Sequence, residues 1–307
     1  MSGPEVVLLS GGTGGAKLAR GMAEVVGADG LAVIVNTGDD IEIYGAQVSP
    51  DPDLVSFWLA DSIDDRGWGL RDDTFAVMDA MRTLGVDVWF NLGDRDLAWC
   101  VERAYMRVTG SSSTEALAEL NRRIGVRSAV LPMSDDAVRT WVKIATGWRP
   151  FQEFMIRDRA AGSIEGLEFR GSESAQPTEA VLEAIAGARA IVIGPSNPLA
   201  SIAPILAVPG ITRAIADAAA PVVAVSPIVA GEVLKGPTAS FMAYAGLPVS
   251  ASGIAEHYGD LLSGIVADED VPWLPTLRTD LRMDGAAGRA RLARETLAFA
   301  EGLGDGA

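Results

Sequence analysis

The chain contains very little histidine, cysteine or positive charge. Its 307 residues include one histidine, one cysteine and 25 Lys and Arg against 41 Asp and Glu, for a formal net charge of −16 at pH 7. The single Cys100 excludes internal disulfides, a cysteine-rich zinc site and a CxxC redox motif. The single His257 argues against nucleophilic catalysis with a serine–histidine or cysteine–histidine pair. The shortage of Lys and Arg argues against nucleic acid as a partner, because phosphate backbones are bound by clustered cations.

Long apolar runs are also absent. No stretch approaches the roughly 18 uninterrupted apolar residues that a membrane-spanning helix requires. The first residues carry no basic segment, and Gly11 and Gly12 interrupt the first apolar run, so no signal peptide is predicted. We therefore expect a cytoplasmic protein with no membrane partner. A length of 307 residues with 49% hydrophobic residues fits one large α/β domain, two smaller domains or a TIM barrel.

Short apolar runs rich in β-branched residues recur along the chain, each followed by a polar, glycine-rich segment. They predict strands buried on both faces of a parallel sheet, at residues 6–9, 31–35, 86–90, 128–131, 190–193, 222–225 and 264–267. Apolar residues spaced three and four apart predict helices, at residues 16–25, 72–83, 114–123, 178–186, 210–219 and 254–262. This alternation predicts a doubly wound, mostly parallel, Rossmann-like α/β fold, with ligands bound beyond the carboxyl ends of the strands.

Residues 139–171 interrupt this alternation. Trp141, Trp148 and the alternating residues 166–170 are typical of extended β structure. We expect a small inserted β-rich subdomain at 139–171, within a core formed by residues 1–138 and 172–307.

The first predicted strand leads through Ser-Gly-Gly-Thr-Gly-Gly-Ala-Lys, residues 10–17, into a predicted helix. A glycine-rich turn at a helix N-terminus can bind a phosphate. The segment is not a Walker A motif, which needs four residues between its first glycine and a Gly-Lys-Ser/Thr. It is not GxGxxG either, because Lys17 occupies the third glycine position counted from Gly12. The alternative is a tight turn that needs glycine for packing. The candidate ligand contacts here are Gly11, Gly12, Thr13, Gly14 and Lys17.

Four carboxylates follow the second predicted strand. Asp39 and Asp40 come shortly after Asn36, and Asp51 and Asp53 lie in a predicted loop at 49–53. A dinucleotide site needs one acid for the ribose, whereas four acids with few nearby cations suit Mg²⁺. Asp51 and Asp53 could instead start turns, since they flank a proline. The sequence thus predicts a metal or substrate site that uses Asn36 and some of these four acids.

Two further loops follow predicted strands in the first half. Asp94 and Arg95 either contact ligand or form a salt bridge that shapes their loop, and Asn91 lies just before them. Ser134 or Asp135 is placed to cap the N-terminus of a helix.

In the second half of the chain, too, polar loops follow the predicted strands, and most of their residues are uncharged. Gly194, Ser196 and Asn197 follow one predicted strand, Ser226 follows the next, and Lys235 adds a cation before a helix. Several such loops at one sheet edge favour a ligand with more than one phosphate.

Taken together, these segments resemble the 2-phospho-L-lactate transferase family of deazaflavin coenzyme F420 biosynthesis. The resemblance spans about residues 5–285 and is carried by residues 10–17, 35–40, 49–53, 66–69, 92–96, 131–136, 194–198, 225–229, 235–237 and 279–281.

The resemblance implies a Mg²⁺-dependent transferase that is often a homodimer. A guanosine-diphosphate-activated three-carbon acid would be the donor, the ribityl hydroxyl of 7,8-didemethyl-8-hydroxy-5-deazariboflavin the acceptor, and GMP the leaving group. It implies catalytic roles for Asp39, Asp40 and Asp53, and a deazaflavin side lined by Asp53, Trp68 and Asn91.

Two other function classes compete with this interpretation. A non-enzymatic regulator that binds nucleotide sugars would keep the glycine loops but would not need the acids, so the acidic cluster favours the enzyme. A nicotinamide dehydrogenase would require GxGxxG and a proton donor, and the sequence offers neither.

Overall fold

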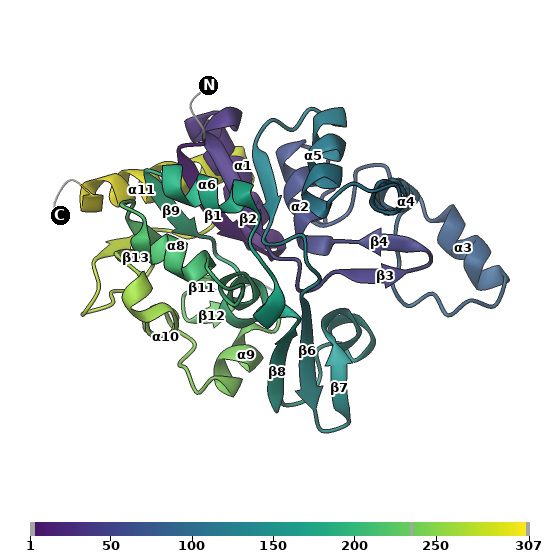
Figure 1. Cartoon of the computed structure of the whole chain (residues 1–307). Coiled ribbons are helices and arrows are strands. Elements are labelled where there is room, and N and C mark those ends of the chain that lie inside the picture. Colours follow the sequence, from purple (N-terminus) through teal and green to yellow (C-terminus); the bar gives the residue numbers. More distant parts are fainter. Residues whose placement is uncertain (1–3, 234–235, 305–307) are drawn as a thin grey trace.

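The computed structural model describes residues 4–233 and 236–304. Its centre is a seven-stranded parallel sheet in the order β14-β13-β10-β9-β1-β2-β5 (Figure 1). The strands are β1 (Val6–Ser10), β2 (Leu31–Val35), β5 (Ala129–Pro132), β9 (Ala190–Ile193), β10 (Val222–Val225), β13 (Gly264–Ala267) and β14 (Thr276–Arg278). The predicted doubly wound α/β fold is therefore confirmed.

The order of the strands reverses beside β1. The chain passes from β1 to β2 and β5 on one side, and returns to β9, β10, β13 and β14 on the other. In such sheets the ligand crevice opens at the carboxyl ends of the strands where the order reverses. The glycine loop after β1 and the Gly194 loop after β9 both lie at this point.

Helices cover both faces of the sheet, and alternate residues of each strand enter different hydrophobic clusters. Val6 and Leu8 pack with one set of helices and Val7 and Leu9 with the other. The first set is α1 (Gly12–Val26), α2 (Pro50–Leu59), α4 (Asp94–Val108), α5 (Ser113–Arg123) and α11 (Gly285–Gly304). The second set is α6 (Glu179–Gly187), α7 (Ala203–Leu206), α8 (Ile211–Asp217), α9 (Thr238–Tyr244) and α10 (Ala251–Tyr258).

Smaller elements extend from this layered core (Figure 1). The hairpin β3 (Ile41–Ile43) and β4 (Ala46–Val48) and the helix α3 (Ala76–Thr83) lie at the right of the view. A short hairpin pairs β11 (Ile228–Val229) with β12 (Glu232–Val233).

The extended structure predicted within 139–171 is present. It forms an antiparallel sheet in the order β7-β6-β8, at the bottom of Figure 1. Its strands are β6 (Arg139–Ile144), β7 (Gly147–Pro150) and β8 (Gly166–Arg170), and a π-helical turn spans Glu153–Arg157. Val142, Ile144 and Phe154 pack in the same cluster as Val7 and Leu9, so this sheet shares a hydrophobic core with one face of the main sheet.

The prediction of a strand at 86–90 is wrong. This segment is irregular, and Val88 and Phe90 pack against helices instead of pairing with a strand. Asp87 interrupts the run and forms an ion pair with Arg157 of the π-helical turn. Val86 is exposed and residues 88–90 are only half-buried, so this short apolar run indicated neither full burial nor strand pairing.

Two predictions about helix starts are also wrong. The predicted loop at 49–53 is the first turn of α2, where Pro50 is tolerated because its missing N–H would have no partner there. No helix follows Ser134 or Asp135. The Ser134 hydroxyl donates to the Gln176 carbonyl instead, and Asp135 accepts from the N–H of Thr114 at the start of α5.

Within the described residues, no single helix has the length and apolar character needed to cross a membrane. One sharply bent pair, Pro198–Leu206 with Ile211–Asp217, meets the criteria of length and composition when the two are taken together.

Candidate active site

The glycine loop turns directly from β1 into α1. Gly12 has a φ of +63°, in the left-handed region that favours glycine, and a Cβ there would meet open space. A Cβ on Gly11 would lie 2.6 Å from Oδ2 of Asp51, and one on Gly14 would collide with the carbonyl of Pro195. Packing therefore requires glycine at 11 and 14, while Gly12 is the position where the backbone is open.

The Gly194 loop is joined to the glycine loop by one hydroxyl. Ser196 Oγ accepts from Gly11 N at 3.2 Å and donates to the Gly11 carbonyl at 2.6 Å, and Gly194 N donates to the Leu9 carbonyl of β1 at 2.9 Å. Asn197 Oδ1 accepts two backbone N–H groups of the following π-helical turn, both at 3.0 Å. Ser196 and Asn197 thus shape the floor of the crevice.

Two of the four predicted acids form a hydrogen-bonded cluster beside the glycine loop. Asp51 accepts from Gly12 N at 2.6 Å and from Asn36 Nδ2 at 2.9 Å. The same Asn36 nitrogen lies 3.4 Å from Asp39 Oδ1, and Gln152 Nε2 donates to Asp39 Oδ2 at 3.1 Å. Asn36, Asp39 and Asp51 are all buried. Residues from the end of β2, the start of α2 and the insertion therefore converge on one point.

Burial of these acids strongly perturbs their protonation. Desolvation raises the pKa of Asp40 to about 7 and that of Asp51 to about 6. It also raises the pKa of Asp39 well above its ordinary value, and the neighbouring charges of Asp51 and Asp40 add to this effect. Arg139 opposes the shift at Asp39 and at Asp40. The cluster thus holds more negative charge than its surroundings compensate.

This donor set fits a hard divalent cation. Asp40 Oδ1 and Thr37 Oγ1 are buried and have no hydrogen-bond partner in the part of the chain that the structure describes. Such orphaned groups are rare in folded proteins and call for a ligand. Carboxylate and hydroxyl oxygens are the ligands that Mg²⁺ takes. Asp39, Asp40 and Asp51 are accordingly the residues that could hold it.

Asp53 has different partners, although it lies on the same turn of α2 as Asp51. Its Oδ1 accepts from Arg103 Nη2 at 2.5 Å and from Trp99 Nε1 at 2.8 Å, both on α4. Asp96 and Cys100 complete this cluster, and the pKa of Asp96 is raised to about 7, chiefly by burial. Among the described residues, Asp53, Asp96 and Cys100 bring three ligand atoms within 4.8 Å of one another. The buried Arg103 already compensates the charge of Asp53, so we favour the other three acids as metal ligands.

The predicted acceptor-side loop is held by its own contacts. Asn91 is exposed and accepts from Arg82 Nη2 at 2.6 Å. The carboxylate of Asp94 accepts the first backbone N–H groups of α3 at 3.0 and 2.9 Å, and hydrogen bonds lower its pKa. Arg95 Nη1 donates to the Arg71 carbonyl at 3.0 Å. Hydrogen bonds of Asp94 and Arg95 therefore shape this region, and the salt bridge expected as the alternative is not formed by either residue within the described part of the chain.

Trp68 lies on a turn close to the glycine loop. Its side chain is 55% exposed, and the guanidinium of Arg66 stacks 4.3 Å from its ring centre. A Cβ on the neighbouring Gly67 would lie 3.9 Å from both Thr13 and Trp58. An exposed aromatic ring is therefore available beside the N-terminus of α1.

The three remaining predicted ligand contacts, Lys17, Ser226 and Lys235, differ in where the structure places them. The Lys17 ammonium lies 5.8 Å from the ring centre of Trp58, near the start of α1. Ser226 is buried and its hydroxyl closes a tight turn with the backbone N–H and carbonyl of Ile228. Lys235 falls outside the described residues.

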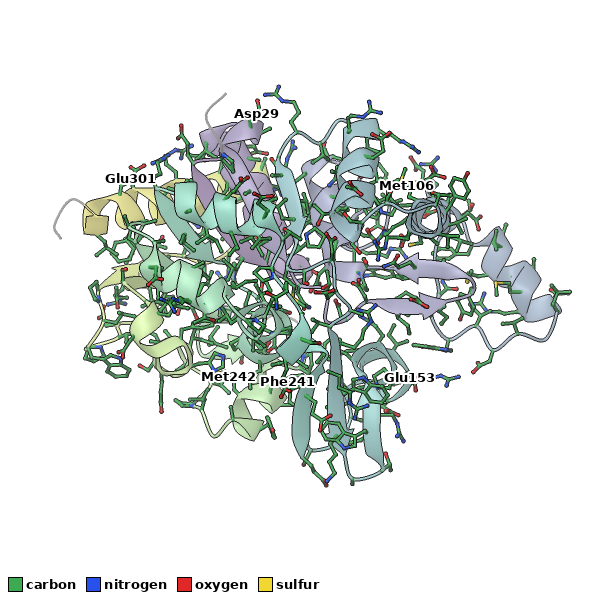
Figure 2. The ribbon with its side chains drawn as sticks, viewed as in Figure 1. Asp29, Met106, Glu153, Phe241, Met242 and Glu301 are labelled. Carbon is green, nitrogen blue, oxygen red and sulfur yellow. The ribbon has the colours of Figure 1, made fainter. Side chains whose placement is uncertain are left out.

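A cavity of about 360 Å³ opens beside the acidic cluster. Residues 38–42 line one wall, and residues 139–141 and 150–153 of the insertion line the other. Figure 2 shows Glu153 of this wall toward the bottom of the view and Asp29, which precedes β2, at the top. The cavity thus lies beyond the carboxyl ends of the strands, where the fold predicts a ligand.

Sequence reasoning missed Arg103, Arg139 and Gln152. Arg103 carried a signal, because it falls four residues after Trp99 and three after Cys100, on a face of α4 that is otherwise apolar. Arg139 and Gln152 carried none, because only the folding of the insertion brings them to the acids.

Comparisons with known proteins identify the family of this chain. Residues 6–274 match the family described as 2-phospho-L-lactate transferase CofD. The chain is 39% identical to a 2-phospho-L-lactate transferase of Methanosarcina mazei, over 86% of this chain and 87% of that protein. It is 41% identical to a phosphoenolpyruvate transferase of Streptomyces coelicolor, over 96% and 98%.

A solved structure supports the fold. A UPF0052 family protein from Bacillus halodurans superposes with a TM-score of 0.65 at 18% identity, covering 97% of this chain and 99% of that one. Identity this low is evidence for the shared architecture alone. The sequence matches carry further: this chain is a transferase enzyme that belongs to the 2-phospho-L-lactate transferase CofD family of coenzyme F420 biosynthesis.

Proposed function

We propose that this enzyme transfers a phosphorylated three-carbon acid from a guanosine-diphosphate-activated donor to the ribityl hydroxyl of 7,8-didemethyl-8-hydroxy-5-deazariboflavin, releasing GMP. The names of the relatives support a phosphorylated three-carbon acid as the group transferred. The observation that carries the proposal is the group of Asp39, Asp40 and Asp51 beside the glycine loop, in which two acids are buried and the Asp40 Oδ1 atom has no hydrogen-bond partner among the described residues. A reaction at a diphosphate needs such a cation-binding centre.

The transfer requires little covalent chemistry from the protein. The hydroxyl oxygen of the acceptor attacks the phosphorus that bears the three-carbon acid, the bond from that phosphorus to the GMP oxygen breaks, and the hydroxyl proton is released. Phosphoryl transfer depends mainly on positioning and electrostatics, so no catalytic histidine is required. When bound, Mg²⁺ would neutralise charge on the diphosphate.

The residues of this chain hold the reacting groups in place. Asn36 and Gln152 fix the orientations of Asp39 and Asp51 through hydrogen bonds. We place the guanosine diphosphate across the crevice between β1 and β9, above Gly12 and Ser196. We place the deazaflavin on the side of Trp68 and Asn91, where an exposed ring and an amide are available.

The test is a reconstitution with purified protein, deazaflavin, Mg²⁺ and each of three donors, carrying phospholactate, phosphoenolpyruvate or phosphoglycerate. We expect GMP and a phosphodiester-linked deazaflavin by mass spectrometry, with both products lost when Mg²⁺ or the deazaflavin is omitted. GMP release that does not need the deazaflavin, or no release from any donor, would refute the proposal.

A further inference from the structure

The cavity beside the acidic cluster contains a guanidinium without an acidic partner. Arg139 lines the cavity together with Asp39 and Asp40. Its Nη1 donates to the carbonyl of Val138 at 2.8 Å and lies 3.5 Å from that of Thr37. Among the described residues, no carboxylate comes within 4 Å of this guanidinium, whereas most arginines on this protein's surface are ion-paired. Arg139 therefore keeps donors available for a ligand.

A second polar group in the same wall has no partner. Thr140 is only 1% exposed and lines the cavity, yet its Oγ1 has no hydrogen-bond partner among the residues described. Its backbone N–H donates to the carbonyl of Gly38 at 2.6 Å, which fixes it against the acidic loop. A buried hydroxyl without a partner destabilises the empty protein unless a ligand satisfies it.

Two aromatic residues complete the wall. The ring of Trp141 is held by the guanidinium of Arg170, 3.9 Å from its centre, and Phe151 packs against Phe241 with ring centres 6.3 Å apart. Both rings line the cavity and are fixed by these neighbours. A small apolar group such as a methyl or methylene would fit against such a surface.

The charge balance of the cavity indicates what this wall binds. Four acids line it, Asp39, Asp40, Glu42 and Glu153, and Arg139 is the basic residue among its lining. An anionic group could enter only next to that guanidinium, since like charges elsewhere repel it. Arginine binds carboxylates through two parallel hydrogen bonds.

We propose that Arg139 and Thr140 bind the carboxylate of the three-carbon acid, with Trp141 and Phe151 contacting its carbon atoms. This inference rests on the proposed function and adds to it the recognition of the transferred group. The guanosine phosphates carry no carboxylate, so Arg139 selects donors that end in an acid from plain nucleotides.

The test compares Arg139→Gln with Lys143→Gln, a matched control. Lys143 lies four residues further along β6 than Arg139, on the same face, but does not line the cavity. The measurements are the KM for the phosphoenolpyruvate-bearing donor, and calorimetric affinities for that donor, GDP and the deazaflavin. We expect Arg139→Gln to weaken donor binding about 10- to 100-fold, as for a lost charge-assisted hydrogen bond. GDP affinity should change less than threefold.

Two further variants sharpen the result. Arg139→Lys should recover part of the donor affinity, because it keeps the charge but loses the paired hydrogen bonds. Thr140→Val, which keeps the shape of the side chain, should weaken the donor several-fold and leave GDP unchanged.

Arg139→Gln that behaves like Lys143→Gln, or that weakens GDP or the deazaflavin as much as the donor, would overturn the carboxylate assignment while leaving the transferase proposal intact. A wild-type enzyme that makes no product would refute the proposed function instead. The calorimetric comparison of donor with GDP would still decide the role of Arg139.

Discussion

Asp51 and Asp53 lie two residues apart on the first turn of α2 and are both buried, yet their surroundings are opposite. Asp51 is held by an amide and a backbone N–H and shares its site with two more acids. Asp53 is paired with Arg103, which is itself only 3% exposed. Burial raises the pKa of Asp51 to about 6, while the cation neutralises Asp53.

The difference teaches that burial alone does not mark a functional carboxylate. A buried acid with its own cation holds the structure together, and removing the cation leaves an uncompensated charge. Buried acids without a cation are costly to the empty protein and are compensated when a ligand supplies the charge. Of the two acids on this short helix, Asp53 thus stabilises the structure through its ion pair with Arg103, which we call the anchor, and Asp51 belongs to the candidate metal site.

The largest effect is expected from breaking the anchor. Arg103→Ala leaves Asp53 buried without its partner, and we expect a loss of about 3–5 kcal/mol in the free energy of unfolding. Denaturant unfolding monitored by tryptophan fluorescence measures it. Adding Asp53→Asn should restore part of the loss, because it removes the stranded charge. If the double variant is as unstable as the sum of both single variants, the ion pair is not the source of the stability.

Unlike Arg103→Ala, the Asp40→Asn variant should lose activity but not stability. Removing one carboxylate from the candidate metal site should lower turnover about 10²- to 10³-fold, as when an electrostatic contact to a transition state is lost. The metal-free variant should nevertheless be at least as stable as wild type at pH 8, because burial raises the pKa of Asp40 to about 7 and disfavours its charged form. Paired thermal melts and rate measurements check this. A variant that is less stable and fully active would reverse the roles of the two regions.

The pH dependence of stability should separate metal-free from metal-loaded protein. Because the pKa values of Asp40 and Asp51 are raised to about 7 and about 6, the folded state binds more protons than the unfolded state between about pH 4 and pH 7. The stability of the metal-free protein should be highest below about pH 4 as far as these groups are concerned, and should fall as pH rises through 7. Added Mg²⁺ should raise the melting temperature more at pH 8 than at pH 5.5. An equal effect of Mg²⁺ on the melting temperature at both pH values would show that these acids do not bind the cation.

The smallest effect is expected on the acceptor side. Asn91→Ala removes an exposed amide and should weaken the deazaflavin a few-fold while leaving GDP affinity unchanged, as a single exposed hydrogen bond contributes about 1 kcal/mol. Fluorescence titration of the deazaflavin and calorimetry with GDP measure the two affinities. Ser196→Ala is the counterpart, since it should weaken GDP more than the deazaflavin. Equal losses for both ligands in both variants would contradict a two-sided site.

Much of this molecule could be predicted from sequence because its core strands are short, apolar and buried on both faces. The runs that became β1, β2, β9, β10 and β13 agree with the structure to within one residue. The segment 86–90 also contains apolar and β-branched residues but pairs with no strand in the part of the chain that the structure describes. Pairing depends on the rest of the sheet, which local sequence does not describe.

The candidate site was less accessible to sequence reasoning. Asp39 and Asp51 were found because acids after a buried strand are conspicuous, and their shared partner Asn36 is close in sequence. The role of Asp53 depends on Arg103, fifty residues away, and that of the cavity on the insertion. Interactions between distant segments, which decide whether a charge is compensated, leave no local pattern.

The hydroxyl of Ser196 forms hydrogen bonds with the backbone of Gly11 and so links residues that are 185 positions apart. During synthesis β1 emerges early, but its neighbour β9 follows only after the whole first half of the chain has been made. At a synthesis rate of about 5–20 residues per second, Ser196 is added about 9 to 37 s after Gly11. The nascent chain can therefore pair one side of β1 with β2 while the other side stays open, and the nucleotide crevice cannot form until the chain up to Ser196 has left the ribosome.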